Sequence, residues 1–360
     1  MPSPLIAKAL KPGDTIAFIS PSARLVDLMP DVMTRATNVL ISRGYKVKTL
    51  STPDTGIQSS IKNRLSEVRE AFLDPTVSAI ICVIGGPSFT ELLPDLTADK
   101  ELHAHIRANP KIVVGYSDIS GLHWFLHAYT GLRTFYGPGA ITELGDIGSV
   151  DDDNTPLGFC AKHLFRAIAN PEPIGDVQRS RFYAPKISHL YKNPSSTESQ
   201  ALAPSPAWRW LRPGKAQGRL FGGCLTVIAR LGAVPSIVPD WRGRIVFVET
   251  ALGDVEGTGN PLHRVRAGFA DLIAAGVFEE AAGLVVGRAF GYDSEEDRGK
   301  YAGVVEGLLC EGRLANKNPF PILMNVDIGH TTPMVTLPFD ALAELDSERD
   351  RFSVLEAGVA

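Results

Sequence analysis

The stretch KIVVGYSDIS, residues 111–120, says most about the fold. Its first four residues form a short apolar run, which predicts a buried strand. Gly115-Tyr116-Ser117 interrupts the run, and a helix is expected from about residue 120 to residue 129. A strand that passes through a sharp Gly-x-Ser turn into a helix lifts a serine hydroxyl to the carboxyl end of a parallel strand. Because Ile119 stands where the full G-x-S-x-G pattern has glycine, two roles stay open: Ser117 is a nucleophile, or Ser117 or Asp118 caps the helix.

Segments of the same kind precede this stretch. Apolar runs at 15–20, 45–50 and 79–84 predict strands, and helical periodicity predicts helices at 31–43 and 63–73. Apolar strands that alternate with helices indicate a parallel sheet covered on both faces. We therefore predict an α/β protein whose residues 1–145 form an N-terminal three-layer domain with a parallel sheet.

The rest of the chain divides into two parts. Residues 146–215 are rich in Asp, Ser, Pro and Asn, which is typical of a linker and loops. Residues 216–360 are predicted to form a C-terminal, β-rich α/β domain, with the active site between the two domains. Its expected strands lie at 245–248, 283–286, 322–325 and 334–337, and its expected helices at 261–275 and 295–310.

Composition narrows the class of protein. The chain has 360 residues, a net charge of −4 and 44% hydrophobic residues, which is enough for a large core and excludes disorder and coiled coil. The near-neutral charge argues against nucleic acid or a membrane surface as the main partner. No apolar run approaches the roughly 18 residues of a membrane span. The first eight residues lack a long apolar stretch, so no secretory signal is expected.

Two common cofactor patterns are missing. The four cysteines are far apart and form no C-x-x-C pair, which indicates free thiols in a reducing compartment rather than a disulfide framework or a zinc site. No P-loop motif occurs, and no G-x-G-x-x-G opens a helix. We expect neither a metal nor a cofactor.

A glycine turn follows the strand predicted at 79–84. In Gly85-Gly86-Pro87-Ser88 the glycines allow close approach to the backbone, and the amide of Gly86 is a candidate oxyanion donor. An ordinary tight turn or a phosphate cradle would have the same sequence.

A serine nucleophile needs a base and a group that orients it. His330 follows Gly329 after an apolar strand, a position from which a side chain can point into a cleft. Glu249 closes the strand predicted at 245–248, where an acid is otherwise out of place, although this position taken alone favours a solvated strand-end carboxylate. Ser, acid, His is one workable chain order for a triad. Of the other histidines, His123 and His127 are expected to pack in the core, and the pair at 103 and 105 to be solvated.

Several short motifs occur in the order found in one enzyme family. The chain resembles the LD-carboxypeptidase family of serine peptidases, which includes the microcin C immunity proteins. The resemblance rests on LKPGDTIAFISPS at 10–22, GYSD at 115–118, GGCL at 222–225, FVE at 247–249 and GHTTP at 329–333. It spans residues 10 to about 340.

The resemblance implies a mechanism. Ser117 would be the nucleophile, His330 the general base and Glu249 the residue that orients His330, with the amides of Gly86 and Asp118 as the oxyanion hole. Family members are typically cytoplasmic homodimers without a cofactor. Carboxypeptidases of the family remove a terminal D-alanine from a murein tetrapeptide, and the immunity proteins cleave a carboxamide that joins a peptide or amino acid to a nucleotide.

Departures from the family pattern concern the substrate. The turn reads IGGPS at 84–88, where the carboxypeptidases tend to have Arg-Gly-Gly-Tyr-Gly, and this looks more like the immunity branch. Ser88 in this turn is a candidate substrate contact. Trp208 and Trp210 are others, since a tryptophan can stack on a nucleobase, although buried packing is an alternative role for them.

The sequence therefore predicts a serine hydrolase that cleaves an amide bond near the carboxyl end of a small peptide-like or aminoacyl-nucleotide substrate. The alternative is a two-lobe protein that binds a small ligand or anion without catalysis.

Overall fold

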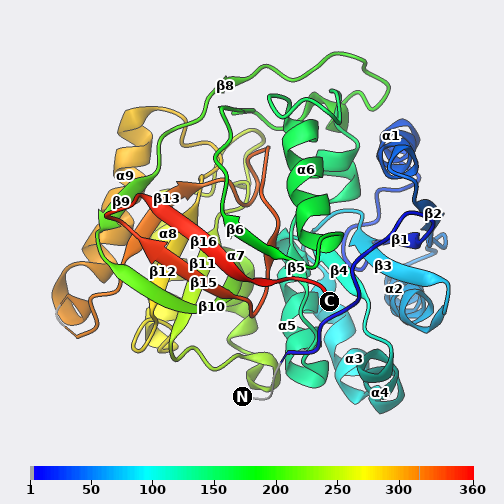
Figure 1. The fold of residues 1–360 in the computed structure, drawn as a ribbon, viewed down its shortest axis with the longest axis horizontal. Coiled ribbons are helices and arrows are strands. Elements are labelled where there is room, and N and C mark those ends of the chain that lie inside the picture. The colour runs from blue at the N-terminus through cyan, green and yellow to red at the C-terminus, as the bar shows by residue number, and fades with distance from the viewer. Residues whose placement is uncertain (1–3, 316) are drawn as a thin grey trace.

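The computed structural model describes residues 4–315 and 317–360. Residues 1–3, part of the stretch in which no secretory signal is expected, lie outside the described residues. The fold has two sheets with helices packed around them, which lie side by side in Figure 1. This is the α/β architecture that the sequence predicts.

The first sheet is built mainly from the N-terminal third of the chain. Its strand order is β14-β5-β4-β3-β1-β2, and all neighbours are parallel except β14 and β5. The elements of this region are β1 (Thr15–Ile19), α1 (Pro30–Ser42), β2 (Lys46–Thr49), α2 (Ile57–Leu73), β3 (Val77–Cys82), α3 (Leu93–Ala98), α4 (Lys100–Ala108), β4 (Ile112–Gly115), α5 (Ser120–Thr130) and β5 (Phe135–Tyr136). β3 and β4 are apolar and buried because helices cover both faces of the sheet.

The second sheet has eight strands in the order β6-β16-β15-β10-β11-β12-β13-β9. Its centre, β10 to β13, is parallel, and antiparallel strands flank it on both sides. Its elements are β10 (Lys215–Cys224), α7 (Leu225–Leu231), β11 (Arg244–Glu249), α8 (Leu262–Ala274), β12 (Gly283–Gly287), α9 (Glu295–Leu309), β13 (Ile322–Val326), β15 (Leu342–Asp346) and β16 (Arg351–Ala357).

The segment 146–215 holds more regular structure than the expected linker and loops. It contains α6 (Pro156–Ile168), β6 (Pro173–Asp176), a small hairpin of β7 (Phe182–Tyr183) with β8 (Ala203–Pro204), and β9 (Arg209–Arg212). β6 and β9 are the two edges of the second sheet. Their polar composition misled the sequence analysis, because edge strands are half solvated and carry few apolar residues. The domain boundaries at 145 and 216 stay a prediction.

One strand in the last third of the chain is also shorter and later than expected. A strand was predicted at 334–337, but only Leu337–Pro338 forms one, as β14, and it joins the first sheet beside β5. The chain therefore crosses between the sheets more than once. The residues that form the candidate site therefore come from both sheets.

An aromatic cluster packs the two sheets together. Trp124 on α5 is fully buried, and its indole Nε1 donates to the carbonyl of Gly222 on β10 at 2.9 Å. Phe221 and Trp241 surround its ring at centroid distances of 5.8 and 5.5 Å. This contact holds α5, the helix that follows β4, against the end of β10. None of the described helices is long and apolar enough to cross a membrane.

Candidate active site

Ser117 lies at the end of β4 in a strained backbone conformation. Its φ is +64°, a value that side chains other than glycine rarely adopt. A short 3-10 turn, Ser117–Ile119, leads directly into α5. This is the strand-turn-helix geometry that the Gly-x-Ser pattern predicts, and it holds the hydroxyl out from the edge of the sheet.

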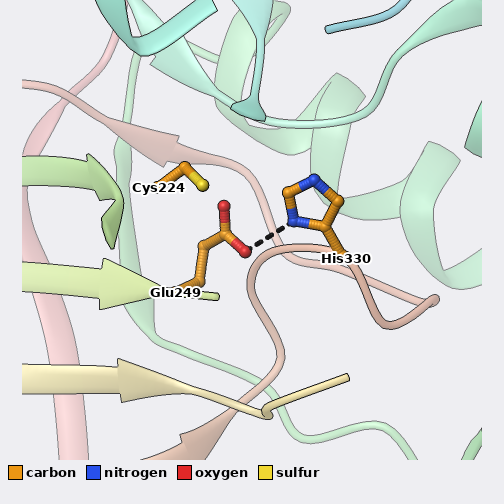
Figure 2. A group of neighbouring side chains, drawn as sticks. All are labelled: Cys224, Glu249 and His330. Carbon is orange, nitrogen blue, oxygen red and sulfur yellow. Dashed lines mark hydrogen bonds and ion pairs between the residues drawn. The ribbon is translucent and has the colours of Figure 1, made fainter. Parts of the chain in front are cut away.

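His330 lies between Ser117 and Glu249. The hydroxyl Oγ of Ser117 is 3.0 Å from Nε2 of His330, and Nδ1 of His330 is 2.7 Å from Oε2 of Glu249. Figure 2 shows the imidazole and the carboxylate facing each other. Glu249 ends β11 and is fully buried, whereas His330 follows β13 in a loop. The structure thus brings together three residues that are far apart in the chain.

The charges in this pair depend on each other. Burial alone lowers the pKa of His330 and raises the pKa of Glu249. The attraction between the two groups outweighs burial, so the pKa of His330 lies above its ordinary value and the pKa of Glu249 below its own. The carboxylate is therefore placed to stabilise an imidazolium.

Two structural features hold the histidine loop in place. A Cβ on Gly329 would lie 2.4 Å from Oε2 of Glu249, so only glycine fits before His330. On the other side of the loop, buried Arg288 donates to Oγ1 of Thr331 at 2.9 Å and to the carbonyl of Pro333 at 3.1 Å. Asp327 neutralises this arginine at 2.5 Å.

A tyrosine connects the acid to the nucleophile. Tyr136, at the end of β5, donates its hydroxyl to Oε1 of Glu249 at 2.5 Å. The phenolic oxygen of Tyr136 in turn accepts the backbone N–H of Ser117 at 3.2 Å. Burial and the neighbouring carboxylate raise the pKa of Tyr136 well above 10, so the phenol stays protonated. In the sequence, Tyr136 is marked only by its place in YGP at 136–138, another short stretch that matches the family pattern, because a tyrosine at a strand end resembles any core aromatic.

The glycine turn after β3 lies against the nucleophile. A Cβ on Gly85 would lie 2.7 Å from Cβ of Ser117 and 3.2 Å from the amide nitrogen of Asp118. Gly86 has φ +140°, and a Cβ there would meet Oγ of Ser22 at 2.7 Å. Both positions therefore require glycine. Of the two amides expected to form an oxyanion hole, that of Gly86 lies in the turn, and the turn runs beside that of Asp118.

The side chain of Asp118 fastens this turn. It is fully buried, and Oδ2 accepts the hydroxyl of Ser22 at 2.6 Å and the amide of Phe89 at 2.7 Å. Oδ1 accepts Arg230 of α7 at 2.6 Å. The carboxylate thus ties the turn to α5 and to the second sheet, a role that the motif did not reveal.

A small cavity opens beside His330. Its volume is about 50 Å³. The residues that line it come from the turn after β4, from the π-helical turn Ala140–Leu144 and from the segment 186–200, and they include Tyr116, Glu143, Lys186 and Tyr191. Glu143 was not singled out in the sequence, because a single acid in a loop carries no pattern.

The other candidate substrate contacts lie away from this cavity. The hydroxyl of Ser88 accepts Arg64 at 3.0 Å and borders a different hollow, between α2 and the turn. Arg179 stacks on Trp208 at 3.8 Å, and Nε1 of Trp210 donates to Asp350 at 2.8 Å. Substrate contact by these three side chains stays a prediction.

Three of the other seven histidines, at 103, 123 and 163, are buried. His123 is buried, and its Nε2 lies 2.9 Å from the carbonyl of Gly115, behind the nucleophile turn. His103 was expected to be solvated and is instead buried, with Nε2 2.7 Å from the carbonyl of Leu96. The expectation was wrong because α3 and α4 were not predicted: His103 lies on α4, which turns its ring toward α3 and the aromatic rings of α5.

Among the described residues, one group has donor atoms close enough to hold a metal ion. Cys224, at the end of β10, joins Glu249 and His330, and the three donor atoms lie within 4.8 Å of one another (Figure 2). Nδ1 of His330 and both carboxylate oxygens of Glu249 already have partners within the protein. Burial raises the pKa of the Cys224 thiol, which opposes the thiolate that a metal would need. This donor set fits a hydrogen-bonded triad better than a metal centre.

Comparison with known proteins gives matches along the whole chain. The family model of the LD-carboxypeptidase N-terminal domain matches residues 16–137, and that of the LD-carboxypeptidase C-terminal domain matches residues 217–345. A putative carboxypeptidase of Vibrio cholerae is 28% identical, with 97% of each chain covered. The microcin C7 self-immunity protein MccF of Escherichia coli is 27% identical, covering 98% of this chain and 96% of MccF. A probable murein peptide carboxypeptidase of Bacillus subtilis is 28% identical over 98% of this chain and 95% of its own.

Solved structures agree with the sequence matches. MccF in complex with aspartyl sulfamoyl adenosine superposes with a TM-score of 0.82 at 25% identity, covering 99% of this chain and 100% of that one. An MccF-like protein from Bacillus anthracis gives a TM-score of 0.82 at 25% identity, and the match covers 97% of this chain and 99% of that one. Fold and sequence comparisons therefore point to the same group of proteins.

Proposed function

Because this chain belongs to the LD-carboxypeptidase family and is a serine hydrolase of the LD-carboxypeptidase and MccF type, we propose that Ser117, His330 and Glu249 are its catalytic triad. The observation that carries the proposal is the unbroken chain of contacts from Oγ of Ser117 to Nε2 of His330 at 3.0 Å and from Nδ1 to Glu249 at 2.7 Å.

The reaction would proceed through an acyl-enzyme. His330 Nε2 takes the proton of the Ser117 hydroxyl while Oγ attacks the carbonyl carbon of the scissile amide. The amides of Gly86 and Asp118 donate hydrogen bonds to the oxyanion. The imidazolium then gives its proton to the leaving nitrogen, and the C–N bond breaks. His330 then takes a proton from water, and the resulting hydroxide attacks the carbonyl carbon of the Ser117 ester. The C–Oγ bond breaks, the imidazolium returns its proton to Oγ, and the carboxylic acid is released.

For the substrate we propose a small aminoacyl-nucleotide amide. The MccF structures hold aspartyl sulfamoyl adenosine and related ligands, and this chain aligns with MccF over nearly its whole length. The turn at 84–88 lacks the tyrosine and arginine expected for the carboxypeptidases. A murein tetrapeptide with a terminal D-alanine is the competing substrate.

Hydrolysis of both substrate types by the purified protein tests the proposal. We expect release of aspartate from aspartyl sulfamoyl adenosine, and complete loss of this activity together with loss of fluorophosphonate labelling in Ser117→Ala. Release of D-alanine from the tetrapeptide alone would assign the chain to the carboxypeptidase activity. If the wild-type protein cleaves neither substrate and is not labelled, the non-catalytic ligand-binding alternative holds.

We also propose that the enzyme works as a cytoplasmic homodimer, as the family resemblance implies. Its four cysteines are unpaired, and three of them are buried, as in proteins of reducing compartments. Light scattering of the purified protein would give a mass of two chains if the proposal is correct, and of one chain if it is not.

A further inference from the structure

Tyr136 is a buried side chain that contacts two members of the proposed triad. It lies at the end of β5, and none of its surface is exposed. Its hydroxyl donates to Oε1 of Glu249 at 2.5 Å, and the phenolic oxygen accepts the backbone N–H of Ser117 at 3.2 Å. A buried tyrosine usually finds one hydrogen-bond partner. This one joins the acid to the nucleophile, and the proposed mechanism gives it no role.

The first contact orients the Glu249 carboxylate. Oε2 lies 2.7 Å from Nδ1 of His330, and Tyr136 binds the other oxygen. The last torsion of a glutamate side chain is broad, so one hydrogen bond leaves the plane of the carboxylate free to turn. A second donor on the other oxygen fixes that plane and keeps Oε2 directed at the imidazole.

The second contact supports the backbone of the nucleophile. Ser117 has φ +64°, and strained conformations of this kind persist only where the surroundings determine them. Ser117 is the first residue of the 3-10 turn Ser117–Ile119, so its N–H has no partner within the turn. The phenolic oxygen accepts this N–H and so supports the conformation that presents Oγ to His330.

Tyr136 can hold both groups because its own position is fixed. β5 pairs with β4 in parallel, and Tyr136 lies opposite Gly115, two residues before the nucleophile. Its ring packs against Phe247 of β11 and against Phe339, at centroid distances of 5.2 and 6.1 Å. A side chain of the first sheet therefore reaches the acid that ends β11 in the second sheet.

We propose that Tyr136 is a positioning residue of the triad, whose hydroxyl holds the Glu249 carboxylate and the Ser117 backbone in the arrangement in which both face His330. The inference rests on the proposed function, since it assigns a role within that triad. In this role Tyr136 does not touch the substrate, and it is not among the described residues that line the cavity beside His330.

The hydroxyl also affects the charges of the pair. A hydrogen bond to a carboxylate stabilises the anion. It does so most strongly when no imidazolium neutralises the carboxylate. Without the hydroxyl, Glu249 would attract a proton on His330 more strongly, so the pKa of His330 should rise further. This direction is opposite to the one expected for Glu249→Gln, which removes the negative charge.

Other titratable groups surround these residues. Glu143 borders the same cavity as His330, and burial raises its pKa to about 7. The remaining groups are phenols, a thiol, an imidazole and a lysine, namely Tyr116, Tyr191, Cys224, His123 and Lys186. Removal of one hydroxyl from Tyr136 leaves all of these side chains in the protein, so a change in the pH profile reports the Glu249 carboxylate.

Tyr136→Phe tests the inference, because it removes the hydroxyl and keeps the ring. We expect kcat for aspartyl sulfamoyl adenosine to fall by roughly 10- to 100-fold, the scale of a hydrogen bond to a charged group, with KM little changed. The acidic limb of kcat/KM should lie at higher pH than in the wild-type enzyme. A purely structural role would lower the free energy of unfolding without moving this limb.

Tyr183→Phe is the matched control. Tyr183 on β7 is also buried, and its hydroxyl donates to the carboxylate of Asp293 at 2.9 Å. The substitution removes the same kind of hydrogen bond at an acid that has no part in the proposed mechanism. It should leave kcat and the position of the acidic limb unchanged.

A second variant, with 3-fluorotyrosine in place of Tyr136, gives a test of opposite sign that does not depend on the folding of the Phe variant. Fluorine makes the phenol more acidic and therefore a stronger donor, so the acidic limb should move to lower pH. A limb that stays in place in both variants, or that moves in the same direction in both, would overturn the inference whatever the loss of kcat.

The rate of fluorophosphonate labelling as a function of pH gives the same readout without the substrate. If the wild-type protein is labelled but does not hydrolyse aspartyl sulfamoyl adenosine, the result counts against the proposed substrate, and the shifts in the labelling profile still decide the role of Tyr136. Absence of labelling in the wild-type protein would overturn the proposed triad, and this role with it.

Discussion

At the scale of single residues, Glu249 is the most informative position. Its carboxylate should stabilise the imidazolium that forms when His330 takes the Ser117 proton. Glu249→Gln keeps the size, removes the charge and can offer an N–H to Nδ1, which favours the wrong tautomer. We expect kcat to fall by ~10³–10⁴ with little change in substrate affinity.

Glu256→Gln is the control for this substitution. Glu256 is 63% exposed and pairs with Lys192 on the surface. Its loss should leave turnover unchanged in the same assay. Near-normal turnover in the Glu249 variant would mean that another carboxylate supports the base.

The pH dependence of kcat/KM depends on the same pair, His330 and Glu249. A general base must be neutral, and Glu249 raises the pKa of His330 above its ordinary value of 6.5. The acidic limb of kcat/KM should therefore lie above pH 6.5 in the wild-type enzyme, with activity lost as the pH falls through it. In Glu249→Gln the limb should move to lower pH. A limb that stays in place would show that it reports another group, such as Glu143.

Chelators test whether the group of Cys224, Glu249 and His330 holds a metal ion that the reaction needs. Because His330 and Glu249 are hydrogen-bonded to each other rather than placed to hold a metal, we expect EDTA or phenanthroline to leave the hydrolysis rate unchanged. Cys224→Ser should retain activity under the same conditions. Loss of activity in chelator with recovery on addition of zinc would replace the serine mechanism with a metal-dependent one.

At the scale of elements, the turn after β3 and the end of β4 are fitted to each other. Gly85→Ala would place a Cβ 2.7 Å from Cβ of Ser117 and 2.9 Å from its Oγ, so one of the two segments must move. We expect kcat to fall by roughly 10², as for a nucleophile displaced by about 1 Å.

Gly303→Ala in α9 is the matched control, since no atom lies within 4 Å of the added Cβ. It should raise the free energy of unfolding by roughly 0.5–1 kcal/mol through helix propensity and leave kcat unchanged. Full activity in Gly85→Ala would show that the turn adapts and does not constrain Ser117.

Sequence patterns predicted the elements that the core defines. The central residues of β3, β4, β11 and β12 are mostly apolar because both faces of each strand are buried, and the positions of these strands were predicted within two residues. α3 and α4 were missed because they are short and largely polar. A local pattern cannot show that such a segment is held by packing against neighbours far away in the chain.

The candidate site was predictable only in part for the same reason. Ser117 carried a local signal, but the pairing of His330 with Glu249 came from a family resemblance. Glu143 and Arg230 belong to no motif, Tyr136 appears only within YGP at 136–138, and the positions of all three in the site depend on which strands end at the same place. The strand orders β14-β5-β4 in the first sheet and β10-β11 in the second determine which strand ends lie next to one another. Neither order can be read from one sequence.

At the scale of the whole molecule, the site depends on contact between the two halves that the sheets form. Substitution of Arg230 tests that contact. Its guanidinium, 43% exposed on α7, reaches Asp118 in the first sheet's nucleophile turn at 2.6 Å. Arg230→Met leaves a buried carboxylate without its cation. We expect the free energy of unfolding, measured with urea, to fall by roughly 1–3 kcal/mol.

A double-mutant cycle separates this ion pair from a simple loss of side-chain packing. In an Asp118→Asn background, Arg230→Met should cost much less, because no charge is left unpaired. Arg242→Met removes an arginine that is 71% exposed and pairs with Asp240 at the surface, so it should change stability by less than about 0.5 kcal/mol. Turnover in Arg230→Met should fall less than in Gly85→Ala, because Ser22 and Phe89 still hold the Asp118 carboxylate. If Arg230→Met costs the same in both backgrounds, the contact between the sheets does not run through this pair, and the aromatic cluster around Trp124 must align the two halves of the site without it.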